Sequence, residues 1–194
     1  NMFGRTDAEY QTEMTPFNPQ SPYACAKVYA YYLVRYYREA FGIFASTGIF
    51  YNHESPRRTA EYVTRKITQS VARIACGKQN RLTLGDMSAR IDWGYSKEYM
   101  EAAWETLQLD EPDDFVIATG EAHSVKEFVD EAFTFVNLKA EDYVDSDQSL
   151  YRPTKTSVLI GDTGKANKAF GYDPRVKFKE LVRIMMEADL EKEG

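Results

Sequence analysis

The sequence has no long apolar run and little cysteine. Its longest uninterrupted apolar stretches, such as residues 28–34, fall far short of the roughly 18 residues that a membrane-spanning helix needs. The first residues also lack the charged and apolar regions of a signal peptide. Two cysteines, Cys25 and Cys76, are too few for a disulfide framework and lack metal-binding spacing. We therefore expect a soluble cytoplasmic protein with buried free thiols and no metal site.

Basic residues are outnumbered by acidic ones. The chain has 24 Lys and Arg against 30 Asp and Glu, a net charge of −6 at pH 7. This balance opposes attraction to nucleic acid or anionic lipid, so we expect neither partner. The 43% of hydrophobic and 28% of charged residues are typical of a folded globular protein rather than a disordered one. A length of 194 residues suits one domain, or one and a fraction.

Segments with helical and extended patterns alternate along the chain. Ser21 as N-cap, Pro22 at the first helical position and Gly42 after the end predict a helix over 22–41. The apolar residues 43–51 predict a buried strand, and the polar residues 52–58 a loop. Further helices are expected at 59–75, 96–107, 163–170 and 178–190, and another after a Ser124 cap. Strands are expected at 81–85, 115–118 and 158–160, and a surface loop at 138–152. The alternation predicts an α/β fold with a mainly parallel sheet.

The clearest chemical signal is a tyrosine and a lysine four residues apart, Tyr23 and Lys27. On a helix this spacing places both side chains on one face. There the ammonium stabilises the phenolate form of the tyrosine. Such a phenol can act as general acid or base at a sugar hydroxyl or carbonyl. The bare pattern also occurs by chance, so a helix-face pair without a catalytic role is the alternative at this point.

The residues around this pair resemble a known family. Residues 15–27, TPFNPQSPYACAK, resemble the start of the active-site helix of extended short-chain dehydrogenases/reductases. More narrowly, NHESPRR at 52–58 and VTRKI at 63–67 resemble GDP-mannose 4,6-dehydratases. Residues 114–125 and YRPT at 151–154 extend this resemblance over essentially the whole chain.

The resemblance implies a fold class and a division into domains. It implies an α/β protein containing the C-terminal part of a Rossmann-like parallel sheet and a smaller α/β sugar-nucleotide-binding domain. Residues 1–76 would belong to the NAD(P)-binding domain, with 94–120 packing back onto it, and 77–194 would mainly bind the sugar nucleotide. The sequence has no glycine turn between a strand and a helix of the kind that holds a dinucleotide pyrophosphate, because the glycines within 161–165 have the wrong spacing. The chain therefore resembles the C-terminal portion of the enzyme.

The resemblance also implies a reaction. The family converts GDP-D-mannose to GDP-4-keto-6-deoxy-D-mannose, a lyase step toward GDP-fucose, with NADP as cofactor and NAD as the alternative. Tyr23 would take the proton of the mannose 4-hydroxyl while hydride leaves C4, and Lys27 would hold the nicotinamide ribose. Water would then be eliminated across C5 and C6, and the hydride would return to C6.

Other residues receive roles from the same resemblance. His53 and Arg58 match cofactor-contacting positions, and arginine suits phosphates as a charge-assisted donor. In relatives the loop with Arg57 and Arg58 also reaches a neighbouring subunit, which implies a homotetramer; a solvated charge pair is the alternative interpretation. The implied substrate-binding residues are Asn52, Lys66, Arg90 and Arg152. His123, beside a helix cap, is expected to be structural.

Several positions depart from the family pattern. Asn1 stands where the family has the Glu that takes the C5 proton, and an amide cannot accept a proton at neutral pH. Ile91 replaces an Arg before the Asp-Trp pair, so Arg90 can substitute only if its loop shifts. Thr59 replaces a Gly, and Lys155 replaces an acidic residue. We therefore expect little or no dehydratase activity from this polypeptide.

Two other functions stay open. The first is a non-catalytic, diverged module that binds a GDP-sugar or assembles with a partner. The second is a 4-keto reductase or 4-epimerase that becomes complete when an N-terminal half is supplied, since these reactions use Tyr23 and Lys27 but not the missing Glu.

Overall fold

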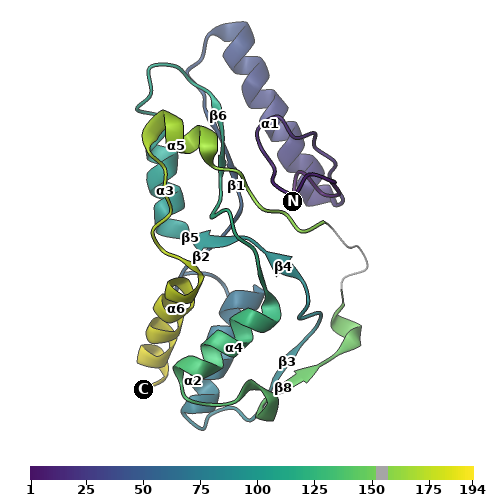
Figure 1. Ribbon diagram of the computed structural model, residues 1–194, viewed down its shortest axis with the longest axis vertical. Coiled ribbons are helices and arrows are strands. Elements are labelled where there is room, and N and C mark those ends of the chain that lie inside the picture. Colours follow the sequence, from purple (N-terminus) through teal and green to yellow (C-terminus); the bar gives the residue numbers. More distant parts are fainter. Residues whose placement is uncertain (152–156) are drawn as a thin grey trace. The chain divides into compact units, whose positions relative to one another are not determined.

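The computed structural model describes residues 1–151 and 157–194 (Figure 1). The chain forms two compact units, each assembled from three stretches of sequence. Unit 1 consists of Asn1–His53, Asp92–Ala122 and 157–175, and unit 2 of Glu54–Ile91, 123–151 and Val176–Gly194, counting described residues only. The sequence prediction divided the chain at one point, into residues 1–76 and 77–194, and so differs from these unit boundaries.

The first predicted helix is confirmed as α1, Pro22–Phe41 (Figure 1). Ser21 caps it by accepting a hydrogen bond from the backbone N–H of Ala24. Gly42 ends it in the left-handed conformation, φ 63°, which glycine adopts without steric cost. Of this long helix, only Ala24 and Tyr31 are buried in the described structure.

A parallel strand pair forms the centre of unit 1. β1 (Thr47–Phe50) pairs with β6 (Asp114–Ile117) in parallel, Thr47 opposite Asp114 and Phe50 opposite Ile117. All four residues of β6 are buried, as expected for a strand of a covered parallel sheet. This pair, with α3 (Ser96–Glu105) and α5 (Gly164–Phe170) in the same unit, confirms the predicted α/β class.

Two local predictions in unit 1 are wrong. The loop predicted over 52–58 begins as a strand, β2 (Asn52–Glu54), because it pairs with β5 (Trp93–Tyr95). The strand predicted at 158–160 is irregular, with only one bridge nearby, between Gln11 and Gly161. There the fully buried Gln11 side chain accepts the hydrogen bond from the Ile160 backbone N–H at 2.8 Å and another from the Tyr51 hydroxyl at 2.9 Å. A buried side chain therefore supplies the acceptor that a strand partner would supply.

Three helices make up most of unit 2: α2 (Val63–Ala75), α4 (Val125–Phe135) and α6 (Phe178–Glu193). The cap predicted at Ser124 is confirmed, since Ser124 and Glu127 form a reciprocal capping box at the start of α4. The short strands form a parallel pair, β3 (Leu82–Leu84) with β8 (Val144–Ser146), and an antiparallel pair, β4 (Arg90–Ile91) with β7 (His123–Ser124). The predicted surface loop 138–152 thus contains β8, flanked by the 3-10 turns Ala140–Asp142 and Gln148–Leu150.

Two further sequence predictions concern the cysteines and the membrane. Cys25 and Cys76 are free, as predicted, but both are exposed, so the expected burial is wrong. Each lies on or next to a helix whose buried face is formed by other residues. Within the described ranges, every helix is too short or too polar to cross a bilayer.

Candidate functional site

The structure brings Tyr23 and Lys27 together on one face of α1. The Lys27 Nζ atom lies 5.4 Å from the centroid of the Tyr23 ring, within the range of a cation–π contact. Both side chains are exposed, Tyr23 at 60%. The first turns of α1 therefore present a phenol and an ammonium to any ligand that approaches this face.

A chain of aromatic rings joins α1 to the end of β1. The centroid of the Phe17 ring lies 4.9 Å from that of Tyr31 in α1 and 5.3 Å from that of Phe3. The Phe3 centroid lies 6.3 Å from that of Tyr51, the residue after β1. Phe3, Tyr31 and Tyr51 are buried and belong to the main hydrophobic cluster of unit 1. Packing of this kind limits the movement of α1 relative to the residues that follow β1.

Asn52 and His53 follow Tyr51 and lie on β2. The His53 Nδ1 atom lies 2.9 Å from the Tyr51 carbonyl oxygen. A carbonyl oxygen only accepts, so Nδ1 carries the hydrogen and Nε2 of the neutral ring is an acceptor. The ring is half-buried, 5.0 Å from Tyr99 and 5.8 Å from Phe50 between centroids, whereas Asn52 is exposed. His53 therefore has a fixed orientation suited to positioning a ligand.

Arg58 is fixed by two side chains of unit 2. Its guanidinium carbon lies 3.4 Å from the centroid of the Tyr62 ring, and its Nε lies 3.2 Å from Oε2 of Glu54. Glu54 is buried and also accepts a hydrogen bond of 2.8 Å from the Thr64 hydroxyl. Burial raises the pKa of Glu54, against the lowering effects of Thr64 and Arg58. Arg57 is exposed, so the two arginines of this loop are not equivalent.

The sequence predictions missed Glu54 and Tyr62. Their spacing of four residues from Arg58 gave no signal, because residues 54–62 are not helical and both contacts depend on how the turn between β2 and α2 folds.

The predicted substrate-binding residues of unit 2 contact protein atoms. The Lys66 Nζ donates to the Thr83 carbonyl oxygen at 2.6 Å. The Arg90 guanidinium lies 3.4 Å from Oε2 of Glu127. Arg152 lies outside the described residues. Lys66 and Arg90 are therefore oriented by neighbouring groups while each keeps part of its surface exposed.

Asn1 lies in unit 1. Its carbonyl oxygen accepts a hydrogen bond of 3.1 Å from the Gly4 backbone N–H, and its side chain is exposed. Unit 1 thus contains Asn1, Tyr23, Lys27, Asn52 and His53, and unit 2 contains Arg58, Lys66 and Arg90.

A buried carboxylate, Asp92, organises the segment after β6. One of its oxygens accepts from the backbone N–H and hydroxyl of Thr119 at 2.9 and 2.7 Å, and the other from the N–H groups of Gly120 and Gly161 at 3.1 and 3.3 Å. Burial raises its pKa against these hydrogen bonds. Asp92 thereby joins three segments beyond the carboxyl ends of β1 and β6, where α/β sheets bind ligands.

The residues present fit one end of a dinucleotide. A phenol and an ammonium on α1 suit a nicotinamide ribose, which offers hydroxyl groups to both. The part of the chain that the structure describes has no strand–glycine–helix turn for the pyrophosphate. These residues therefore match the nicotinamide end and not the phosphate end.

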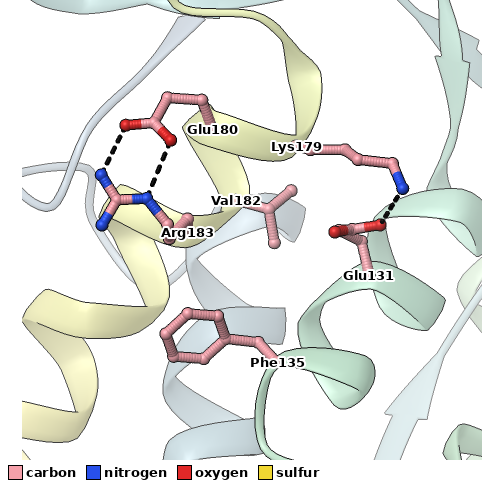
Figure 2. A pocket seen from close by; sticks show the side chains of 6 residues that line it. All are labelled: Glu131, Phe135, Lys179, Glu180, Val182 and Arg183. Carbon is pink, nitrogen blue, oxygen red and sulfur yellow. Dashed lines mark hydrogen bonds and ion pairs between the residues drawn. The ribbon is translucent and has the colours of Figure 1, made fainter.

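Unit 2 also contains a pocket that none of these residues lines (Figure 2). Its lining consists of Glu131, Phe135, Lys179, Glu180, Val182 and Arg183, from α4 and α6. Its charged side chains pair with each other, Lys179 with Glu131 at 3.4 Å and Arg183 with Glu180 at 2.6 Å (Figure 2). We assign no ligand to it, because its charges are already compensated.

Solved structures that share this fold include the following two. RMD from Pseudomonas aeruginosa, complexed with NADPH, aligns with a TM-score of 0.89 at 19% identity, over 98% of this chain and 64% of that one. The UDP-glucose 4-epimerase of Thermus thermophilus, in complex with NAD, aligns with a TM-score of 0.82 at 22% identity, over 97% of this chain and 60% of that one. At these identities the likeness shows the α/β fold alone.

The sequence comparisons are more specific. The family profile described as GDP-mannose 4,6 dehydratase matches residues 1–185. GDP-mannose 4,6 dehydratase 1 of Arabidopsis thaliana is 48% identical over 190 residues, 98% of this chain and 52% of that protein. The human GDP-mannose 4,6 dehydratase is 47% identical over 207 aligned positions, 98% of this chain and 56% of that protein. The chain spans about half the length of these relatives, and it belongs to the GDP-mannose 4,6-dehydratase family as a C-terminal portion.

Proposed function

We propose that this chain supplies the Tyr23–Lys27 pair and part of the GDP-sugar site of a GDP-mannose 4,6-dehydratase-like enzyme. The observation that carries the proposal is the exposed pairing of these two side chains on α1, with Lys27 Nζ 5.4 Å from the Tyr23 ring. The long family match supports it. In this proposal unit 1 belongs to the nucleotide-binding domain and unit 2 mainly to the sugar-nucleotide-binding domain.

Each residue has a specific task in this proposal. Tyr23 moves the proton of the mannose 4-hydroxyl, and Lys27 stabilises the phenolate and binds the ribose hydroxyls of the cofactor. NADP, or NAD as the alternative, supplies hydride chemistry when bound. His53 and Arg58 contact the cofactor, with Arg58 oriented by Glu54 and Tyr62. Asn52, Lys66 and Arg90 contact the GDP-sugar.

We further propose that the polypeptide of residues 1–194 does not dehydrate GDP-mannose by itself. It has no glycine turn for the cofactor pyrophosphate. The position of the family's elimination base is occupied by Asn1, whose amide cannot take a proton from C5.

The first test is GDP binding by titration calorimetry, together with a turnover assay, on the purified polypeptide. We expect GDP to bind and GDP-mannose to remain unconverted. Lys66→Ala should weaken GDP binding at least 10-fold, because a charged hydrogen bond contributes roughly 1.5–3 kcal/mol. The exposed Lys139 provides the control, and Lys139→Ala should leave binding unchanged. Conversion of GDP-mannose by the polypeptide alone would contradict the proposed inactivity, and absence of GDP binding would contradict the substrate site.

Asn1 favours a second function, simple 4-keto reduction or 4-epimerisation of a GDP-sugar. These reactions need the Tyr23 proton and the cofactor hydride but no base at C5. The test supplies the N-terminal half of a relative and compares wild type with Asn1→Glu by mass spectrometry of the product. We expect loss of water to increase at least 100-fold in Asn1→Glu. Loss of water from the wild type at the same rate as from Asn1→Glu would rule out this second function, whereas hydride transfer without loss of water would support it.

The proposal also includes cytoplasmic localisation and a homo-oligomer formed through the exposed Arg57 and its neighbour Arg58. Sedimentation of the completed enzyme tests the assembly. Arg57→Ala should lower the assembly mass, and an unchanged mass would exclude this loop as a subunit contact.

A further inference from the structure

The imidazole of His53 lies among aromatic rings of unit 1. Its centroid is 5.0 Å from that of Tyr99 in α3 and 5.8 Å from that of Phe50 in β1. The Phe50 and Tyr99 centroids are also 5.8 Å apart, so the three rings contact one another. The imidazole is tilted by 34° to the Tyr99 ring and stands at 88° to the Phe50 ring. Its two neighbours therefore restrict its rotation from different directions.

Tyr99 is the fixed member of this group. It is fully buried and belongs to the main hydrophobic cluster of unit 1. Its helix, α3, follows directly after β5, the strand that pairs with β2 and so with the segment of His53 (Figure 1). A Cβ atom at Gly94 of β5 would lie 2.2 Å from Cε2 of Tyr99. The ring therefore lies directly on the strand backbone, a position that the glycine makes available.

The ring of Tyr99, and not its hydroxyl, makes the contact with His53. The hydroxyl oxygen is buried and has no hydrogen-bond partner among the residues that the structure describes. It therefore orients no neighbouring group. Packing of the ring is what remains, so a phenylalanine at this position should hold His53 equally well.

The orientation of His53 decides which hydrogen bond it can offer a ligand. The χ2 torsion of a histidine has broad minima, so the side chain's own preferences do not fix the contact of Nδ1 with the Tyr51 carbonyl oxygen at 2.9 Å. While this contact holds, the hydrogen is on Nδ1 and the lone pair is on Nε2. Nε2 then accepts a hydrogen bond from a ligand and cannot donate one.

We infer that Tyr99 is a positioning residue that packs against the imidazole of His53, keeps Nδ1 on the Tyr51 carbonyl oxygen, and thereby keeps Nε2 as an acceptor. The site then selects a ligand group that donates, such as the carboxamide N–H or a ribose hydroxyl of a nicotinamide nucleotide. The inference rests on the proposed function for the identity of this ligand. The positioning itself involves only residues of unit 1.

The experiment records the imidazole nitrogens of the polypeptide of residues 1–194 by long-range proton–nitrogen NMR. The chain contains two histidines, His53 and His123, so the signals are few. At about pH 9, well above the ordinary pKa of histidine, we expect His53 of the wild type to carry its hydrogen on Nδ1. Tyr99→Leu should move the two nitrogen shifts of His53 toward each other, because the ring rotates and the tautomers mix. Tyr99→Phe should keep the wild-type shifts.

Three controls accompany these variants. His123, stacked on Phe178 with centroids 3.9 Å apart, should keep its shifts in both Tyr99 variants. Gly94→Ala retains the tyrosine but displaces its ring, so it should change His53 in the same direction as Tyr99→Leu, and it decides if Tyr99→Leu does not fold. Phe128→Leu removes another fully buried ring, in unit 2, and should leave His53 unchanged. Circular dichroism verifies that each variant is folded.

Two results would overturn the positioning by Tyr99. They are a wild-type His53 with its hydrogen on Nε2, and His53 shifts in the folded Tyr99→Leu or Gly94→Ala that equal those of the wild type. A change of His53 in Phe128→Leu as large as in Tyr99→Leu would also refute it, because the effect would then not be specific to Tyr99.

A titration with NADP then tests the use of this orientation. The wild-type shifts of His53 should respond, and Tyr99→Leu should bind NADP about 5-fold more weakly, because one hydrogen bond is lost. Equal affinity of the two proteins, with a His53 that responds to NADP, would contradict the inferred selection of a donor. If NADP leaves the wild-type His53 unchanged, the cofactor role in the proposed function is wrong, while the positioning is judged by the tautomer alone.

Discussion

At the scale of the residue, the buried Glu54 beside Arg58 should make the free energy of unfolding depend on pH. Burial raises the pKa of Glu54, so the folded protein binds this proton more tightly than the unfolded chain does. The resulting stabilisation is full below the ordinary pKa of glutamate and is lost as the pH rises through the raised value. Glu54→Gln removes this loss. We expect the stability of Glu54→Gln relative to wild type to increase as the pH rises above about 4.

Urea unfolding at several pH values measures this difference. A constant offset between the two proteins is allowed, because glutamine can accept from Thr64 but cannot form the ion pair with Arg58. If the stability of Glu54→Gln relative to wild type stays constant or decreases as the pH rises, the pKa of Glu54 is not raised in the folded state.

A second prediction at this scale concerns the buried ion pair of unit 2. Arg65 of α2 forms an ion pair with Asp189 of α6, and Thr68 donates to the same carboxylate at 2.7 Å. Arg65 is 3% and Asp189 2% exposed. Asp189→Ala leaves a buried arginine without its countercharge, so we expect a loss of about 3–5 kcal/mol in the free energy of unfolding.

The matched control is Glu180→Ala, which breaks the pair with Arg183 on the exposed side of α6. Exposed pairs contribute little, so its urea midpoint should equal that of wild type. The double change Arg65→Met with Asp189→Leu should recover stability relative to Asp189→Ala. Equal midpoints for Asp189→Ala and wild type would refute the assigned role of the pair.

At the scale of the element, the start of α1 depends on Ser21. Its side chain accepts the hydrogen bond from the Ala24 N–H, and few residues of α1 are buried, so the cap matters more here than in a buried helix. Ser21→Ala should destabilise the first turn by about 1 kcal/mol, and Ser21→Asp should keep the cap. Hydrogen exchange of the amides in 24–28 measures this, with roughly fivefold faster exchange expected in Ser21→Ala alone. Equal exchange in both variants would mean that the cap contributes nothing.

At the scale of the whole molecule, the net charge of −6 governs the interaction with polyanions. We expect no shift of duplex DNA in a gel assay at about 0.15 M salt, because the excess of acidic residues repels phosphates. Micromolar binding that weakens steeply with salt would instead reveal a local basic surface.

The local signals of the sequence predicted the elements well where they were strong. As predicted, α1 begins after Ser21 and ends at Gly42, and the Ser124–Glu127 capping box starts α4. Prediction failed where long-range partners decide the conformation. Residues 52–54 are polar yet form a strand, because β5 offers its backbone. Residues 158–160 look like a strand yet are irregular, because Gln11 takes their hydrogen bond.

The candidate site shows the same division. The spacing of Tyr23 and Lys27 is a property of one helix, so the sequence predicted that they share a face. The orientation of Arg58 depends on Glu54 and Tyr62, and Asp92 joins three segments that are distant in sequence. Such contacts form only when the chain has folded.

The sequence by itself determined the family, the α/β class and the shared helix face of Tyr23 and Lys27, because motifs and helix periodicity are local properties of neighbouring residues. Only the tertiary structure decided that the chain divides into two units of interleaved stretches and which carboxylates are buried. It also decided that large apolar side chains of α1, among them Tyr29 and Tyr36, are exposed in the described structure. The physical reason is that burial depends on which distant segments meet, and no local pattern contains that information.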